Sequence, residues 1–218
     1  MNEKIDFSGL GIAPRILTIL QNLGFKKPTP IQEKALPIAL EGKDLIGIAQ
    51  TGTGKTLAFG VPMVQGMIPQ KRRLVVVPTR ELALQVAQMI QKIGRPLGLH
   101  GAVLIGGESM GRQIFDLRRN PQIIIGTPGR IIDHLERKIL RLDKVDMLVL
   151  DEADRMLDMG FAPQLKRILA VVPKDRQTLL FSATMPADIV NIARAYMKFP
   201  VRVEIDQQGT PAADVSHE

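Results

Sequence analysis

The stretch that decides the fold reads Leu45-Ile46-Gly47-Ile48-Ala49-Gln50-Thr51-Gly52-Thr53-Gly54-Lys55-Thr56. Its first four residues form a short apolar run typical of a buried strand, and an amphipathic helical pattern begins at Thr56. Between them, glycines allow the backbone to curl so that successive N–H groups point inward, and the helix N-terminus adds partial positive charge. A strand, a glycine-rich turn and a helix in this order predict a loop that binds phosphate.

The residues after the glycines suit a nucleoside triphosphate. Lys55 would neutralise the β- and γ-phosphates, and the Thr56 hydroxyl would bind Mg²⁺. The loop departs from the general pattern in one place, because it begins with Ala49 where that pattern has Gly. The alternative is a glycine-rich turn that only opens a helix, but the intact Gly54-Lys55-Thr56 favours phosphate binding.

A second unusual stretch, Asp151-Glu152-Ala153-Asp154, follows the apolar run Met147–Leu150. Three carboxylates in four residues repel one another, which favours a divalent cation nearby. We expect Asp151 to hold Mg²⁺ through water, and Glu152 to act as the general base that orients the attacking water on the γ-phosphate. The alternative is a solvated acidic turn that caps the following helix.

Apolar runs alternate with longer amphipathic segments along the chain. The runs predict strands at Leu45–Ile48, Leu74–Val77, Ala102–Ile105, Ile123–Ile125, Met147–Leu150, Thr178–Phe181 and Val201–Ile205. The amphipathic segments predict helices at Pro14–Leu23, Ile31–Leu40, Thr56–Val64, Glu81–Ile93, Met110–Arg118, Arg130–Arg137, Ala162–Val171 and Ala187–Tyr196. This alternation predicts an α/β fold: a doubly wound, mostly parallel sheet with helices on both faces. Ligands bind such a sheet at the carboxyl ends of its strands, so function is expected in the loops after the strands.

The composition limits the class of protein. The 218 residues are 45% hydrophobic, enough for a substantial core, and the lack of cysteine excludes disulfides and thiol chemistry. The net charge of +7 favours a polyanionic partner, nucleic acid first, although a basic protein kept soluble by its charge is the alternative. Only 4% of residues are aromatic, so a nucleic acid would be held by its sugar-phosphate backbone. No apolar run approaches the roughly 20 residues of a membrane span, so a soluble cytoplasmic protein is expected.

The phosphate loop Ala49–Thr56 and the acidic motif Asp151–Asp154 together resemble the N-terminal, RecA-like domain of DEAD-box ATP-dependent RNA helicases. Further motifs occur in that family's order, namely Gly24-Phe25-Lys26-Lys27-Pro28-Thr29-Pro30-Ile31-Gln32, Pro78-Thr79-Arg80-Glu81-Leu82-Ala83, Gly106-Gly107, Thr127-Pro128-Gly129-Arg130 and Ser182-Ala183-Thr184. Each string is short, but their order along nearly the whole chain is very specific. The resemblance implies ATP and Mg²⁺ as cofactors and RNA as a partner.

The first of these motifs resembles the family's adenine-reading Q motif. A Gln amide can donate to N7 and accept from N6 of adenine, and guanine cannot satisfy it in the same way, so Gln32 suits selection of ATP over GTP. Phe25 is expected to stack on the base; the alternative is a core aromatic after a helix stop. Phe7 stands where the family has an isolated aromatic, and packing is an equally good interpretation.

The resemblance assigns contacts with the RNA backbone to Pro78, Thr79, Arg80, Gly106, Gly107, Thr127, Pro128, Gly129 and Arg130. Hydroxyls, guanidiniums, glycine N–H groups and helix N-termini are the groups that hold phosphates. The alternatives are an N-capping turn at Thr127–Gly129 and a flexible turn at Gly106–Gly107, so Arg130 is the more discriminating residue. Two basic clusters, Lys71–Arg73 and Arg118–Arg119, precede strands and are expected to be solvated at the opposite edge of the sheet.

Ser182 and Thr184 follow the strand predicted at Thr178–Phe181, at the same sheet edge as Asp151 and Lys55. Their hydroxyls are placed to hydrogen-bond Asp154, and the resemblance implies that this contact couples the nucleotide to RNA. A helix N-cap at Thr184 is the alternative.

The resemblance also implies a second RecA-like domain, which supplies a cationic finger to the γ-phosphate. The chain contains no such domain, so residues 1–206 are expected to be the N-terminal domain (helices of the Q motif in 1–42, sheet core in 43–206), and 207–218 the start of the interdomain linker. Alone, this chain is expected to be a monomer that binds ADP or ATP and hydrolyses almost nothing. Two other classes remain open: an RNA clamp controlled by ATP, and an unrelated phosphate-loop enzyme such as a nucleotide kinase.

Overall fold

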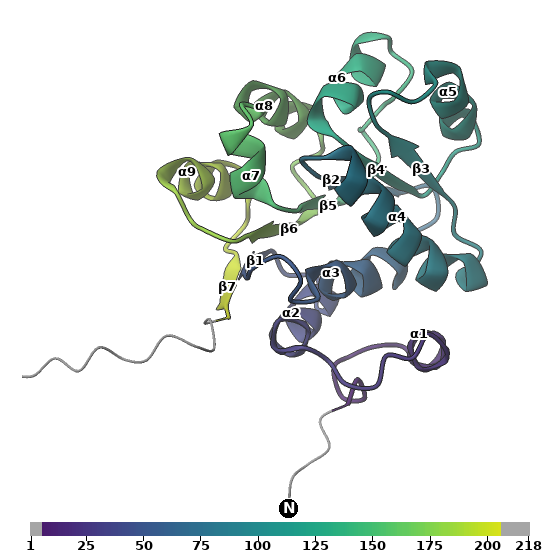
Figure 1. The fold of residues 1–218 in the computed structure, drawn as a ribbon, viewed down its shortest axis with the longest axis vertical. Helices are drawn as coiled ribbons and strands as arrows, with labels where there is room; N and C mark the ends of the chain where they lie inside the picture. Colours follow the sequence, from purple (N-terminus) through teal and green to yellow (C-terminus); the bar gives the residue numbers. More distant parts are fainter. Residues whose placement is uncertain (1–5, 206–218) are drawn as a thin grey trace, which may run out of the picture.

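Within the described residues 6–205 of the computed structural model, seven strands form one open sheet in the order β3-β4-β2-β5-β6-β1-β7 (Figure 1). The strands are β1 (Leu45–Ile48), β2 (Arg72–Val76), β3 (Gly101–Leu104), β4 (Ile123–Gly126), β5 (Val145–Leu150), β6 (Gln177–Ser182) and β7 (Val201–Glu204). Every pair of neighbours is parallel. The predicted doubly wound α/β fold is therefore confirmed, and the sheet is parallel throughout.

Helices cover both faces of the sheet (Figure 1). One face carries α1 (Pro14–Asn22), α2 (Pro30–Leu40), α3 (Lys55–Val64) and α4 (Arg80–Gly94), and the other carries α5 (Met110–Arg118), α6 (Pro128–Glu136), α7 (Ala153–Asp158), α8 (Ala162–Val171) and α9 (Ala187–Tyr196). Side chains of each strand alternate between the two cores: Met147 and Val149 of β5 face α1–α4, whereas Leu148 and Leu150 face the other group. Burial on both faces explains the continuous apolar runs.

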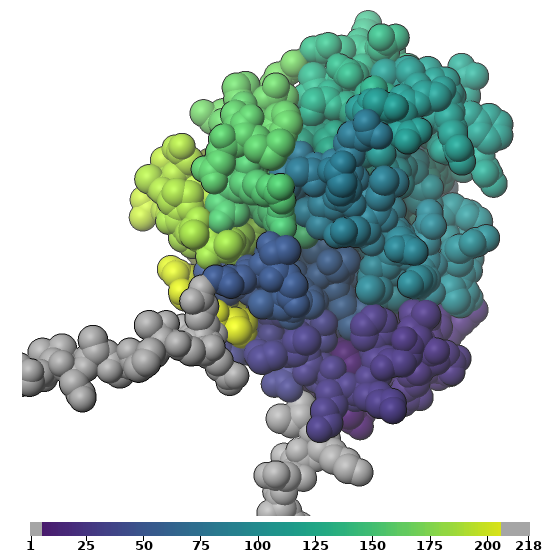
Figure 2. Space-filling view, viewed as in Figure 1, coloured from purple at the N-terminus to yellow at the C-terminus, as the bar shows by residue number. Residues whose placement is uncertain are grey.

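The two N-terminal helices belong to the same body as the sheet. Ile16 and Leu20 of α1 and Ile31 of α2 are buried in the core that α3 and α4 form on the first face. In Figure 2 the purple N-terminal segment accordingly packs directly against the blue α3 region. The helices that carry the Q-like motif are thus held in a fixed position relative to β1.

Two short elements were not predicted: α7 and a 3₁₀ turn at Arg95–Leu97. They are too short for a helical period to show in the sequence. The helix predicted at Arg130–Arg137 begins two residues earlier as α6, because Pro128 occupies its first turn and Thr127 precedes it. The predicted linker at 207–218 lies outside the described residues.

The interpretation of Lys71–Arg73 as a solvated cluster was wrong for one member. The Arg73 side chain is buried, and its guanidinium donates to the carbonyl oxygens of Gln65 (2.7 Å), Gly66 (3.0 Å) and Pro62 at the end of α3. Its Nε lies 3.6 Å from the Asp146 carboxylate. Arg73 therefore neutralises helix-terminal carbonyls and joins α3 to β2 and β5, which a list of basic residues does not reveal.

Gly47 of β1 provides a test of this packing, because it lies directly opposite Phe181 of β6. A Cβ at position 47 would come within 2.6 Å of the buried Phe181 ring. Gly47→Ala is therefore expected to lower the free energy of unfolding by about 1–3 kcal/mol in urea titrations. The matched control is Gly111→Ala on exposed α5, where removing a helical glycine should stabilise by up to about 1 kcal/mol. Equal stability of the two variants would contradict the close packing of β1 on β6.

Candidate functional site

The loop between β1 and α3 has the curled form that its glycines predict. Gly52 and Gly54 have φ values of 87° and 93°, a region that other residues rarely adopt, and Gly54 directly precedes α3. The Thr53 hydroxyl donates to the carbonyl oxygen of Gln50 at 2.7 Å, which tightens the turn. The buried Lys55 ammonium donates to the carbonyl oxygen of Ala49 at 3.0 Å, so it lies under the loop.

Asp151 follows β5 and lies beneath the same loop. It is only 2% exposed, and its Oδ1 is 4.0 Å from Lys55 Nζ. Burial, with a smaller contribution from the neighbouring Glu152, raises the pKa of Asp151 to about 6 against the opposing effect of Lys55. A carboxylate whose charge is this poorly compensated favours an added cation.

Glu152 connects the acidic motif with the phosphate loop. Its Oε1 accepts a hydrogen bond from the Thr51 hydroxyl at 3.0 Å, and its Oε2 pairs with Arg155 Nη1 at 3.0 Å. Its backbone is left-handed, with φ of 53°, which costs a non-glycine residue about 1–3 kcal/mol. Arg155 was not predicted as a site residue, because only the short helix α7 places it beside Glu152.

Asp154 is the centre of a hydrogen-bonded group that joins β5 to β6. Its Oδ2 accepts from the N–H of Ala183 (3.1 Å) and from both the N–H and the hydroxyl of Thr184 (2.9 Å each). Its own N–H donates to the Ser182 hydroxyl at 3.2 Å. Burial alone would raise the pKa of Asp154, but hydrogen bonds from Thr184, the Arg155 N–H and Ser182 outweigh it and hold the pKa below its ordinary value. The predicted hydrogen bonds are present, and their coupling role stays a prediction.

Gln32 lies against the phosphate loop, and both ends of its amide are hydrogen-bonded there. Its Oε1 accepts from the Thr29 N–H at 2.9 Å, and its Nε2 donates to the carbonyl oxygen of Gly54 at 3.0 Å. Gln32 therefore contacts the loop that would hold the phosphates directly, a contact that the sequence alone did not establish. Phe25 is partly buried and packs on the core, and Phe7 is 5% exposed within it, which supports the packing interpretation for Phe7.

The three loops assigned to RNA follow β2, β4 and β3, which are neighbours in the sheet. Thr79, after Pro78, caps α4 by accepting from the Leu82 N–H at 3.3 Å. The Arg80 guanidinium lies over Gly107, where a Cβ would be 1.8 Å from its Nη1. Only a glycine at 107, with its φ of 73°, leaves room for this approach.

The third of these loops is tied to the second. Arg130 Nη1 donates to the carbonyl oxygen of Glu108 at 3.2 Å, while Arg80 Nη2 lies 3.8 Å from the Glu108 carboxylate. The N–H of the nearly buried Thr127 donates to the carbonyl oxygen of Leu104 in β3, which fixes the start of α6 at Pro128. Gly106 and Gly129 are half-buried, and no atom would crowd a Cβ at either position. Glu108, which sequence reasoning missed, therefore orients both predicted RNA-binding arginines.

The carboxyl edge of the sheet thus carries two groups of loops. Those after β1, β5 and β6 form the phosphate-loop side, and those after β2, β4 and β3 form the arginine side. The phosphate-loop side offers the oxygen ligands that Mg²⁺ prefers, a carboxylate at Asp151 and a hydroxyl at Thr56, so the donor set fits this ion. Within residues 6–205, no helix is both long enough and apolar enough to cross a bilayer.

Comparison with known proteins identifies the class to which this fold and site belong. The family model of the DEAD/DEAH box helicases matches residues 29–192, more than half of the chain. The chain therefore belongs to the DEAD/DEAH box helicase family. Membership also sets aside the nucleotide-kinase alternative.

Two curated relatives and one solved structure illustrate the similarity. The chain is 50% identical over 203 residues to the ATP-dependent RNA helicase CshA of Listeria monocytogenes, covering 91% of this chain and 39% of that protein. It is 46% identical over 204 residues to the DEAD-box ATP-dependent RNA helicase CshA of Bacillus subtilis, covering 92% and 41%. A crystal structure of a DEAD box protein from the hyperthermophile Methanococcus jannaschii matches with a TM-score of 0.87 at 39% identity, covering 92% of this chain and 56% of that one. The chain spans about two fifths of the length of these curated relatives.

Replacing Asp151 by Asn is expected to change how stability depends on pH. The folded-state pKa is raised, so the folded protein binds the proton more tightly than the unfolded chain, and the wild type loses stability as the pH rises from about 4 to about 6. Asp151→Asn should therefore be more stable than the wild type at pH 7, by up to about 3 kcal/mol, and this advantage should disappear near pH 4.

Thermal melts between these pH values check the expectation, with Asp158→Asn on the exposed side of α7 as the matched control. A destabilised Asp151→Asn variant at pH 7 would show that the Asp151 charge is already well compensated in the folded protein.

Proposed function

We propose that this chain is the ATP-binding domain of an ATP-dependent RNA helicase. The observation that carries the proposal is the meeting of three groups at one edge of the sheet: the buried Lys55 ammonium, the buried Asp151 carboxylate 4.0 Å away, and the Gln32 amide on the Gly54 carbonyl oxygen. A cation for phosphates, a carboxylate for a metal and an amide for a base are the three elements that ATP recognition requires.

The residues of the site have distinct roles in this proposal. N–H groups of Gln50–Thr56 receive the phosphates, and Lys55 exchanges its contact with the Ala49 carbonyl oxygen for a phosphate oxygen. Thr56 and Asp151 hold Mg²⁺, which when bound neutralises developing charge on the phosphates. Glu152 orients the attacking water as general base, and it becomes free to do so when Thr51 turns from Glu152 toward the nucleotide.

Gln32 provides base selectivity in the same proposal. Its amide donates and accepts one hydrogen bond each within the protein, and adenine offers the same complementary pair through N6 and N7. Phe25 precedes Gln32 by seven residues in the sequence and is partly buried. Its ring is proposed to stack on the adenine.

The arginine side of the edge is proposed to hold the RNA backbone. The N-termini of α4 and α6, the uncrowded Gly106 and Gly129, and the guanidiniums of Arg80 and Arg130 are donors without base preference. Asp154, held by Ser182 and Thr184, follows β5, the strand of the phosphate-loop side that adjoins β2 of the arginine side, and is proposed to couple the two sides. Recognition by these backbone contacts does not depend on the base sequence of the RNA.

Unwinding of RNA is proposed for the parent protein, not for this domain alone. Efficient hydrolysis needs a cationic finger opposite the γ-phosphate, worth about 10³–10⁵ in rate, and we assign it to a second RecA-like domain joined through the segment after residue 206. In this proposal, residues 1–206 of the chain are the N-terminal domain, and residues 207–218 are the start of the linker. We further propose that it is a monomer, located in the cytoplasm, and nearly inactive by itself.

The discriminating test is nucleotide preference. Gln32→Ala is expected to reduce the ratio of Mg–ADP to Mg–GDP affinity about tenfold, because a paired amide is worth about 1–3 kcal/mol of base discrimination. Lys55→Ala is the matched control: it should weaken both nucleotides equally and leave their ratio unchanged, because it contacts only phosphate. Isothermal titration calorimetry measures both. An unchanged ratio in Gln32→Ala would refute adenine recognition by Gln32.

A further inference from the structure

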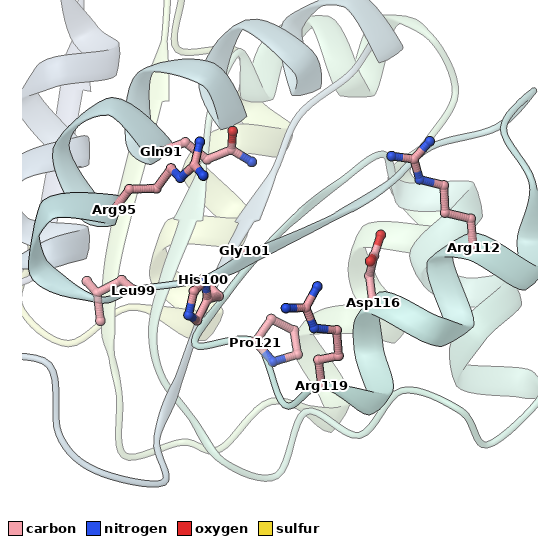
Figure 3. Close-up of a pocket in the computed structure, with 9 residues that line it drawn as sticks. All are labelled: Gln91, Arg95, Leu99, His100, Gly101, Arg112, Asp116, Arg119 and Pro121. Carbon is pink, nitrogen blue, oxygen red and sulfur yellow. The ribbon is translucent and has the colours of Figure 1, made fainter.

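A groove runs along the free edge of β3, away from the phosphate loop. It consists of two adjoining hollows of about 500 and 300 Å³ that share Gln91, Gly101, Arg112 and Asp116. β3 is the edge strand of the sheet, so α4 and the Arg95–Leu97 turn form one wall of the larger hollow and α5 forms the other (Figure 3). We call it the β3 groove.

The β3 groove gathers unpaired positive charge. Arg95, Arg112 and Arg119 line the larger hollow, and in Figure 3 their guanidiniums extend into the space between the two walls. Within residues 6–205, none of the three guanidiniums makes an ion pair or a hydrogen bond. Asp116 is the one carboxylate of this hollow in the described part of the chain. By contrast, Arg80, Arg130 and Arg155 near the candidate sites are each held by an acceptor.

Local structure fixes two of these arginines on one wall. Arg112, Asp116 and Arg119 follow the spacing i, i+4, i+7, which places them on one side of α5 and its C-terminal end. The Arg119 guanidinium lies 5.9 Å from the centre of the exposed Phe115 ring. A guanidinium in such a cation–π contact keeps N–H groups free for an anion and loses less entropy on binding it.

The β3 groove opens onto the arginine side of the functional edge. Its smaller hollow is lined by Glu108 and Ser109, directly after Gly106-Gly107, and by Arg112. Glu108 is also the residue that holds Arg80 and Arg130. A strand of nucleic acid that crosses the loops after β2, β4 and β3 therefore reaches the groove as soon as it passes the edge of the sheet.

We propose that the β3 groove binds the phosphates of the RNA segment that extends beyond these three loops, with Arg95, Arg112 and Arg119 as the contacts. The inference rests on the proposed RNA-binding function and lengthens its binding track. An acidic peptide could pair with the same arginines and with the open edge of β3. RNA is favoured because the smaller hollow is lined by Glu108, which directly follows Gly106-Gly107 and contacts both Arg80 and Arg130.

The test compares two lengths of fluorescent oligouridine, about 6 and about 20 nucleotides, binding to this chain by anisotropy at several salt concentrations. The variant Arg95→Gln/Arg112→Gln/Arg119→Gln is matched by Lys71→Gln/Lys144→Gln/Lys174→Gln, which removes the same charge from exposed positions outside the groove. The groove variant should bind the long RNA at least about tenfold more weakly, with a salt slope smaller by about 2, since each phosphate contact on a single strand contributes about 0.7. The short RNA should be unaffected, and the control should change by less than about twofold.

The outcomes separate the inference from the function on which it rests. Equal weakening of both RNA lengths, or no weakening of the long one, would overturn the groove assignment while the proposed RNA binding stands. Failure of the wild type to bind either RNA would refute both. A hexaglutamate peptide that binds the wild type but not the groove variant, together with equal affinity of the long RNA for both proteins, would show that the groove binds an acidic peptide. The RNA assignment would then be wrong.

Discussion

The buried carboxylate of Asp151 is the constraint on which the functional edge depends. It is 2% exposed, it lies 4.0 Å from Lys55 Nζ, and its pKa is raised to about 6, so at neutral pH the protein retains a charge that its own residues compensate poorly. A buried charge that is poorly compensated destabilises the folded protein, and such destabilisation is expected where a bound ligand completes the site. The placement of β5 next but one to β1 brings the charge under the phosphate loop, and the hydrophobic cores on both faces keep it there.

Around this charge, the polar groups proposed to bind ATP are already engaged with one another. Lys55 donates to Ala49, Thr51 to Glu152, and Gln32 to Gly54. Binding of a nucleotide would exchange these contacts rather than fill vacant ones, so its net free energy is smaller than the sum of the new interactions. The same exchange would release Glu152, whose left-handed backbone stores strain beside the phosphate loop. If Glu152 is the general base as proposed, nucleotide affinity and its activation would be linked.

Most of the fold was predictable from the sequence, because apolar runs buried on both faces have an unambiguous signature. The loops after the strands were predictable for the same reason, since a parallel sheet places them at one edge. The remainder depends on contacts between distant residues. Arg73 looks like any other basic residue until the end of α3 is placed beside it. Arg155 requires the six-residue α7, and the role of Glu108 requires the loops after β2, β3 and β4 to be side by side.

The most direct measurement of the central claim is a crystal structure of this chain with Mg²⁺ and ADP. The account predicts the diphosphate in the curled turn at Gly52–Thr56, the ion on the Asp151 carboxylate through water, and the adenine paired with the Gln32 amide. Nucleotide bound at another place, or an Asp151 still facing only Lys55 with the turn closed above it, would contradict the account.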